Sequence, residues 1–274
     1  MSNIPFEDFG GEGEVLHFAH ANGYPPSCYR QLLLPLTEHY RVLGMHLRPM
    51  WSKEPPTSLK SWETLAEDLI AFLEGQGLKK VIGVGHSLGA VTTMFAAVKR
   101  PDLFSKLVLL EPVFLPPKVI FWGSFVPRFM RGWFLPFIPR AKNRTHLWDS
   151  REEVFTSYRN KKVFSHFSDE VLRDFVEHGL EEKEGGKVGL VYPREWEAHI
   201  YSFFPGVWKP LKTIELPILG VRGEKSDTIF PHAWAFWKAH YPGHTLVEFP
   251  DSGHLVPLEY PQKVVEQMLS FLAE

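Results

Sequence analysis

The sequence predicts an α/β fold with a mostly parallel sheet flanked by helices. Short apolar or β-branched runs alternate along the chain with longer segments whose apolar residues recur at helical spacing. The alternation stops near residue 112 and resumes near residue 213. Strands separated by helices form βαβ units, in which neighbouring strands run parallel, so the sheet is expected to be built from both flanking parts of the chain.

The composition is that of a globular protein. The chain has 274 residues, of which 44% are hydrophobic and 23% charged, and this excludes a disordered or collagen-like chain. A formal charge of −2 is too balanced for a protein that binds nucleic acid by overall attraction. Cys28 is the single cysteine, which excludes an intrachain disulfide scaffold. Without a signal peptide or an apolar run of about 18 residues, we expect a cytoplasmic protein with no stable membrane insertion.

The first part of the chain is expected to supply four strands and two long helices. The strands are expected at residues 15–19, 41–45, 80–84 and 106–110. The helices are expected at residues 61–76 and 88–99, and a shorter helical stretch contains Leu32, Leu33 and Leu36. Gly77 can supply a left-handed stop for the first long helix, and Arg100-Pro101 ends the second.

The last part of the chain returns to the same alternation. Strands are expected at residues 217–221 and 245–249, followed by helices at about 232–240 and 261–273. We therefore expect residues 1–112 and 213–274 to form one α/β core.

Residues 113–212 are predicted to form a helical cap, or lid, inserted into this core. An unstructured connection of that length is rare, and Ser150 to Glu153 has the pattern of a capping box that opens a helix. Twenty of the 39 aromatic residues fall in this region, and we expect them to pack the cap onto the core. Residues 117–144 contain six basic and no acidic residues, but their four prolines prevent one long amphipathic helix, so binding to a membrane surface is not expected.

The motif Gly85-His86-Ser87-Leu88-Gly89 provides the strongest local signal. G-x-S-x-G is short enough to occur by chance, and a tight turn with an incidental serine is the alternative. Here the motif directly follows one expected strand and opens the next expected helix, which is the setting of a nucleophile elbow. Ser87 is therefore the candidate nucleophile, while His86 is expected to pack or hydrogen-bond away from the reacting atoms.

A serine hydroxyl needs a base, and His254 is the candidate. It follows the expected strand 245–249, so it should lie at the carboxyl edge of the sheet, where Ser87 emerges. Four other histidines could approach that edge and remain alternatives: His20, His46, His199 and His232.

A carboxylate should orient the imidazole of the base. Asp227 follows the expected strand 217–221, and the chain order Ser87, Asp227, His254 is a known order for such a triad. Glu224, in the same loop, and Glu111, directly after the strand at 106–110, are its rivals.

Attack on a carbonyl also requires backbone donors for the oxyanion. One is expected to be the amide of Leu88, immediately after the nucleophile, and the other to come from the turn after the first parallel strand. Tyr24 is the predicted donor in that turn, and Asn22 is the alternative if the register differs.

These motifs together resemble the α/β-hydrolase superfamily, in its capped serine-hydrolase branch of esterase-like enzymes. The resemblance rests on Asn22-Gly23-Tyr24-Pro25, the elbow at Ser87, the loop 222–227 and Gly253-His254. It implies the α/β-hydrolase fold with a cap insertion. The chain departs from the family where His-Ala-Asn-Gly replaces the commoner His-Gly, and the family's N-terminal antiparallel strands are expected to be shortened or absent.

The resemblance implies a serine hydrolase. The sequence contains no phosphate-binding glycine loop and no spacing of paired metal ligands, so neither a nucleotide cofactor nor a metal is expected. Related dehalogenases and epoxide hydrolases carry an aspartate at the elbow, so Ser87 argues against those reactions. The cap is aromatic and is expected to offer few charges where it faces the core, which favours a small or medium apolar carboxylic ester or lactone as the small-molecule substrate. Two alternatives remain, a carbon–carbon bond hydrolase with the same triad and a non-catalytic ligand receptor that kept the fold.

Overall fold

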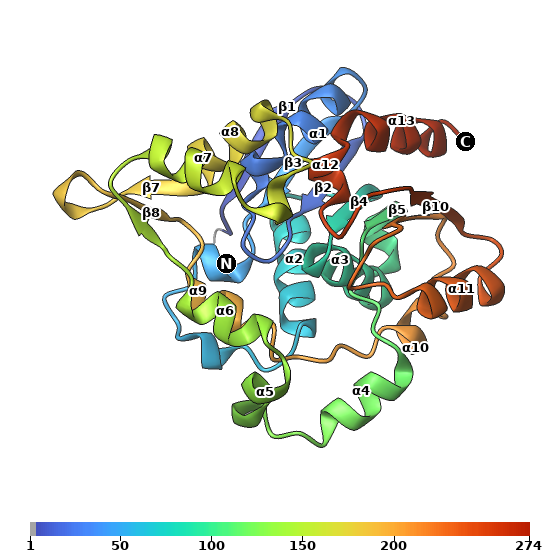
Figure 1. Ribbon diagram of the computed structural model, residues 1–274. Helices are drawn as coiled ribbons and strands as arrows, with labels where there is room; N and C mark the ends of the chain where they lie inside the picture. Colours follow the sequence, from blue (N-terminus) through green and yellow to red (C-terminus); the bar gives the residue numbers. More distant parts are fainter. Residues whose placement is uncertain (1–3) are drawn as a thin grey trace.

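The computed structural model describes residues 4–274 and has a seven-stranded sheet at its centre (Figure 1). The strand order is β1-β3-β2-β4-β5-β9-β10, and every neighbouring pair is parallel except β1 with β3. The strands are β1 (Phe6–Gly10), β2 (Val15–Ala19), β3 (Arg41–Met45), β4 (Val81–His86), β5 (Phe104–Leu110), β9 (Ile218–Gly223) and β10 (Thr245–Phe249). The predicted α/β fold is thus confirmed.

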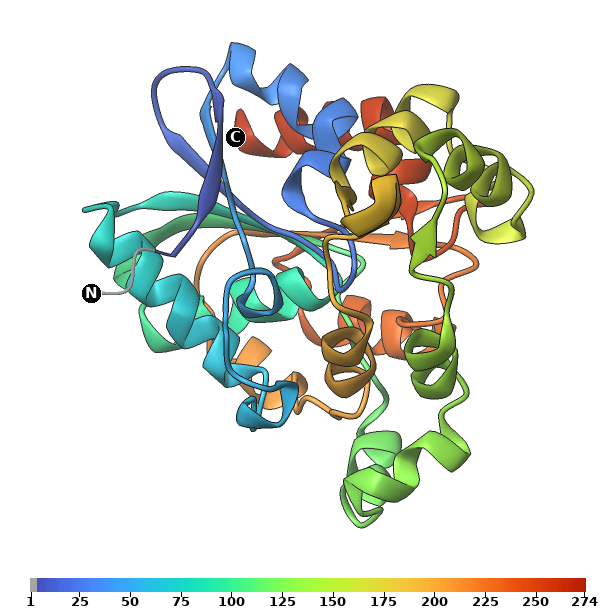
Figure 2. The same cartoon turned by 90° about the vertical axis from the view of Figure 1, so that its left-hand side faces the viewer.

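Helices cover both faces of this sheet, as the two views agree (Figures 1 and 2). One face packs against α2 (Glu63–Gly75), α3 (Leu88–Lys99), α10 (Trp208–Leu211) and α11 (Pro231–His240). The other packs against α1 (Arg30–Leu33), α12 (Val256–Glu259) and α13 (Pro261–Leu272). Each face has its own cluster of buried apolar side chains, so the nearly continuous apolar sequences of the central strands are explained by burial on both sides.

The N-terminal antiparallel part of the sheet was expected to be shortened or absent, and it is shortened to a single strand. β1 pairs antiparallel with β3 at the edge of the sheet, so one N-terminal antiparallel strand is present. Its sequence Phe-Glu-Asp-Phe-Gly contains a register shift between Asp8 and Gly10, and its residues are only partly buried or exposed. A short, irregular edge strand of this kind lacks the apolar run by which the buried strands are recognised.

The segment between β5 and β9 contains helices and a small second sheet. Its helices are α4 (Pro117–Ser124), α5 (Arg128–Phe134), α6 (Phe137–Asn143), α7 (Arg151–Arg159), α8 (Asp169–His178) and α9 (Arg194–Ile200), followed by α10. The three-stranded antiparallel sheet has the order β6 (Leu147–Trp148), β8 (Val188–Leu190), β7 (Leu180–Glu182). The segment that was predicted to be helical therefore contains a small sheet besides its helices. At its centre, Ser150 accepts a hydrogen bond from the Glu153 amide at 3.2 Å, as its sequence predicts for the start of α7.

The aromatic residues of this segment fall into two groups. Tyr158 of α7 and Phe175 of α8 are buried and belong to the same apolar cluster as Tyr29 and Leu32 of the core. Phe121 and Trp122 of α4 and Trp133 and Phe134 of α5 are exposed, and α4 buries none of its residues. The expectation that the aromatics pack the segment onto the core holds for the first group and is wrong for the second.

Candidate active site

Ser87 lies on a sharp turn between β4 and α3. Its backbone has φ 55° and ψ −114°, a conformation that an L-residue adopts only at a cost. A Cβ atom on Gly89 would overlap the carbonyl oxygen of Ala19, and one on Gly85 would lie 2.5 Å from the Gly89 carbonyl. The glycines of the motif are therefore required because the turn brings three backbone segments into contact.

The imidazole of His254 lies between Ser87 and a buried carboxylate. Its Nε2 is 2.9 Å from the Ser87 Oγ, and its Nδ1 is 3.2 Å from the Oε2 of Glu111. Because a carboxylate only accepts, Nδ1 carries the proton in this network and Nε2 accepts from the serine hydroxyl. Ser87 is 6% exposed and the His254 side chain 23%, so the pair is sheltered but reachable.

Glu111, rather than Asp227, is the carboxylate that meets the imidazole. Glu111 directly follows β5, is fully buried and has a positive φ of 45°. It accepts hydrogen bonds from the Gly223 amide, from the Ser226 hydroxyl at 2.6 Å and from the Thr228 hydroxyl at 2.9 Å, besides that from His254.

The predicted pairing of Asp227 with His254 is corrected by this geometry. The Asp227 side chain is exposed, and within residues 4–274 it forms no hydrogen bond or ion pair with His254. Glu224, the other rival, accepts from the Asp251 amide at 3.1 Å and is also exposed. The loop after β9 turns Ser226 and Thr228 inward instead, and these hydroxyls bind the carboxylate from the neighbouring strand.

Thr228 is a site residue that the sequence did not reveal. Its Oγ1 lies 2.9 Å from the His254 Nδ1 while it donates to Glu111, so the imidazole N–H is shared between the two oxygens. The run Ser226-Asp227-Thr228 signals a polar loop, but alternate side chains of the run could equally have pointed inward.

The turn after β2 has a different register from the one predicted. The Tyr24 amide donates to the Ala21 carbonyl at 3.2 Å and closes a turn in which Gly23 has φ +88°, so it is already engaged. The amide of Asn22 has no acceptor among the described residues, and Leu88 is the first residue of α3, where helix amides lack internal partners. Asn22 and Leu88 therefore offer the free donors at this edge.

His86 connects the three loops of the site. Its Nε2 donates to the His254 carbonyl at 2.9 Å, and its Nδ1 accepts from the Tyr29 hydroxyl at 2.7 Å. Tyr29 in turn accepts from the Ala21 amide at 3.4 Å. Burial lowers the pKa of His86 well below its ordinary value, so the ring stays neutral and can both donate and accept. The expected role in hydrogen bonding, away from the reacting atoms, matches these contacts.

The other candidate histidines bind elsewhere. His20 is fully buried, donates to the Ala21 carbonyl and accepts from the Leu47 amide, and burial lowers its pKa to about 3. His46 pairs with Glu7, His199 lies 3.1 Å from the Leu59 carbonyl oxygen, and His232 stacks on Phe230. These contacts leave His254 as the histidine that contacts Ser87.

One ion pair lies against the turn after β2. Glu197 of α9 approaches within 3.5 Å of where a Gly23 Cβ would be, and its Oε2 is 2.9 Å from the Arg144 Nη2. The Asn22 side chain donates to the Glu197 carbonyl at 3.1 Å. Burial raises the pKa of Glu197, and Arg144 opposes that shift. The segment 113–212 therefore contributes a charged pair close to the site, where the sequence led us to expect few charges.

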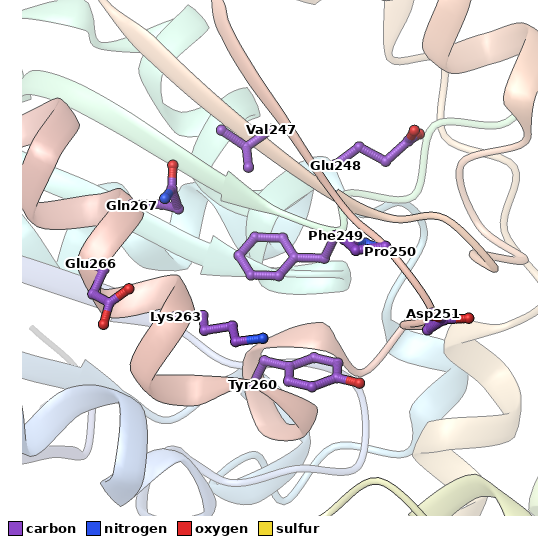
Figure 3. A pocket seen from close by; sticks show the side chains of 9 residues that line it. All are labelled: Val247, Glu248, Phe249, Pro250, Asp251, Tyr260, Lys263, Glu266 and Gln267. Atoms are coloured by element: carbon purple, nitrogen blue, oxygen red, sulfur yellow. The ribbon is translucent and has the colours of Figure 1, made fainter.

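A separate hollow on the surface lies between β10 and α13 and is lined by Phe249, Asp251, Tyr260, Lys263 and Glu266 among others (Figure 3). Neither Ser87 nor His254 lines it, so it is not part of the candidate site. In the part of the chain that the structure describes, no three His, Cys, Asp or Glu side chains gather as metal ligands would.

Comparison with known proteins identifies the family. The sequence model of the alpha/beta hydrolase family matches residues 18–267. The chain belongs to that family. It is 26% identical to the uncharacterized hydrolase YugF of Bacillus subtilis, covering 98% of this chain and 94% of the relative. It is 33% identical to the strigolactone esterase D14 of Arabidopsis thaliana over 93% of this chain and 91% of the relative. 

The solved structures agree in fold. That of E-2-(acetamidomethylene)succinate hydrolase superposes with a TM-score of 0.83 at 19% identity, covering 99% of this chain and 95% of the other.

Among residues 4–274, none of the helices combines the length and apolar character that crossing a bilayer requires.

Proposed function

We propose that this α/β hydrolase is a serine hydrolase that cleaves a small or medium apolar carboxylic ester or lactone. Ser87 attacks the carbonyl carbon while His254 takes the hydroxyl proton at Nε2. Glu111 orients the imidazole and stabilises its charged form, and the amides of Leu88 and Asn22 receive the oxyanion. His254 then returns the proton to the leaving alcohol, and a water activated by the same histidine releases the acid.

The observation that supports this proposal most directly is the 2.9 Å approach of His254 Nε2 to Ser87 Oγ, with a buried carboxylate behind Nδ1. The positive φ of both Ser87 and Glu111 adds to it, because strained residues at one sheet edge persist only where the surrounding fold holds them. The esterase named among the relatives supports the ester substrate by analogy.

An activity-based probe tests the nucleophile. A fluorophosphonate is expected to label wild-type protein at Ser87, and Ser87→Ala is expected to abolish both labelling and hydrolysis of p-nitrophenyl esters. Removing one hydroxyl leaves little cavity, so the unfolding free energy should change by less than about 1 kcal/mol. An intact wild-type protein that never labels would favour a ligand receptor, and undiminished hydrolysis by Ser87→Ala would reject the assignment.

The bond that is cleaved needs a second comparison. Short p-nitrophenyl esters and lactones are to be tested beside vinylogous diketones, whose cleavage breaks a carbon–carbon bond. Turnover of the esters or lactones is expected. Turnover of the diketones alone would replace the ester proposal with a carbon–carbon hydrolase that uses the same three side chains.

A further inference from the structure

The helices α4 to α6 display an unusual set of exposed rings. Trp133 is 80% exposed, Trp122 68% and Phe125 66%, and Phe121 and Phe134 are similarly open. We call residues 117–143 the aromatic projection, because α4 and α5 stand away from the sheet in both views (Figures 1 and 2). Clustered exposed aromatics of this kind mark a surface that meets an apolar partner.

The projection is held in place by its inner side. Phe204 lies within 3 Å of where a Gly123 Cβ would be, and the Arg131 guanidinium stacks 4.7 Å from the centre of the same ring. Arg131 also donates to the carbonyls of Val126, at 2.9 Å, and of Ser202. Arg128 stacks on Phe203 at 4.1 Å. The rings are therefore exposed on an anchored support.

The charges of the projection have one sign. Lys118, Arg128, Arg140 and Lys142 are exposed, and none forms an ion pair with a carboxylate among residues 4–274. The sequence from 117 to 148 contains no Asp or Glu. A second copy of this chain docking on the same surface would bring like charges together, whereas an anionic surface would pair with them.

We infer that the aromatic projection docks on the surface of an anionic lipid bilayer. Tryptophan rings favour the level of the headgroups, and lysine and arginine near a membrane are attracted to acidic lipids. The prolines at 117, 127, 136 and 139 exclude one long amphipathic helix, and for that reason the sequence alone argued against binding to a membrane surface. The inference departs from that expectation because the three short helices present their rings on a compact support, which does not require a long helix. Docking of this kind is peripheral and independent of the proposed hydrolysis.

Vesicle sedimentation tests this inference with the whole chain. Wild-type protein is expected to sediment with vesicles of phosphatidylcholine mixed with phosphatidylglycerol, less with phosphatidylcholine alone, and less as salt is added. The variant Trp122→Ser/Trp133→Ser is expected to lose at least about tenfold in partitioning because it removes the two largest exposed rings. Val163→Ser, which alters an exposed apolar residue outside the projection, is the matched control and should bind like wild type.

The charge variant Lys118→Gln/Arg140→Gln/Lys142→Gln tests the electrostatic part. Its affinity for the mixed vesicles should fall about fivefold for each charge removed, with little change on phosphatidylcholine alone. Failure of wild type to bind either vesicle, or equal binding by the tryptophan variant, would overturn the inference. So would a wild-type dimer that the tryptophan variant disrupts while vesicles remain unbound, because a second copy would then cover the rings.

Hydrolysis of a water-soluble ester separates this inference from the proposed function. All the variants above leave Ser87, His254 and Glu111 intact, so each should retain wild-type rates on that substrate. Quenching by brominated lipids locates the contact, since Trp122→Phe keeps a ring at position 122 but should lose part of the quenching seen in wild type.

Discussion

At the scale of single residues, the candidate site is a relay of hydrogen bonds that reaches from Ser87 to the buried Glu111. Ser87 and His254 could be predicted because each has a local signature, an elbow between strand and helix and a loop after the last strand. The carboxylate that meets His254 could not be predicted in this way. Three acidic residues follow neighbouring strands at the same edge, and the choice among them depends on which loop turns inward. That choice is made by Ser226 and Thr228, whose hydroxyls bind Glu111 and leave Asp227 in solvent.

Replacing each of the two rival carboxylates by the corresponding amide gives a matched pair of variants. Glu111→Gln is expected to lower kcat by about 10²- to 10⁴-fold, because the amide cannot stabilise the imidazolium as a carboxylate does. Asp227→Asn is expected to stay within about twofold of wild type, since that side chain is exposed and does not contact the imidazole. Steady-state rates on one p-nitrophenyl ester, measured well below the unfolding temperature, decide the matter. A large loss of kcat in Asp227→Asn with none in Glu111→Gln would restore Asp227 as the carboxylate that orients His254.

At the scale of elements, the sequence predicts those strands and helices whose buried apolar residues recur at regular spacing. The strands with both faces covered and the helix α3 agree with their expected positions, and Gly77 ends α2 with φ +66°. β1 and the small sheet β6–β8–β7 were not foreseen because they are short and partly exposed, so no apolar period marks them. For the aromatic residues of α4 the sequence predicted burial that the structure does not have. Their hydrophobicity predicts burial, but Phe121 and Trp122 are exposed, and in the described part of the chain no element covers them.

The contact between α3 and β2 provides a test at this scale. Gly89→Ala is expected to lower the unfolding free energy by about 3 kcal/mol, because its Cβ would overlap the Ala19 carbonyl and backbone must shift. Gly75→Ala, in α2 with nothing within 4 Å of the new methyl group, is the control and should be neutral or stabilising by up to about 1 kcal/mol. Urea unfolding of both variants measures the difference. Equal stabilities would show that the elbow tolerates a methyl group at position 89.

At the scale of the whole molecule, three histidines are sealed inside the core. Burial lowers the pKa of His17 and of His20 to about 3, and that of His86 well below its ordinary value. The unfolded chain binds these protons near pH 6.5, so between that pH and the lower folded values it holds more protons than the folded state. The unfolding free energy should therefore fall as the pH is lowered below about 6.5, by about 1.4 kcal/mol per pH unit for each histidine.

His17 allows this dependence to be isolated. Neither of its ring nitrogens has a hydrogen-bond partner among the described residues, so the buried polar ring costs free energy even at neutral pH. His17→Leu is expected to raise the unfolding free energy at pH 7 by about 1 kcal/mol and to reduce the slope between pH 6.5 and 5 by one proton. Urea unfolding at several pH values measures both effects. An unchanged slope in the variant would mean that His17 is not neutral in the folded chain.

Two side chains contact the Nδ1 of His254, Glu111 directly after β5 and Thr228 in the loop after β9. A negative charge placed on either would act on the imidazole from nearly the same direction. The Thr228 Oγ1 lies 2.9 Å from the Glu111 Oε2, so a carboxylate introduced at position 228 would share a proton with Glu111, and only one of the two positions can hold the negative charge at a time. The fold therefore provides two positions, after β5 and after β9, from which a carboxylate can meet this nitrogen, and the chain order of the three residues does not follow from the fold alone.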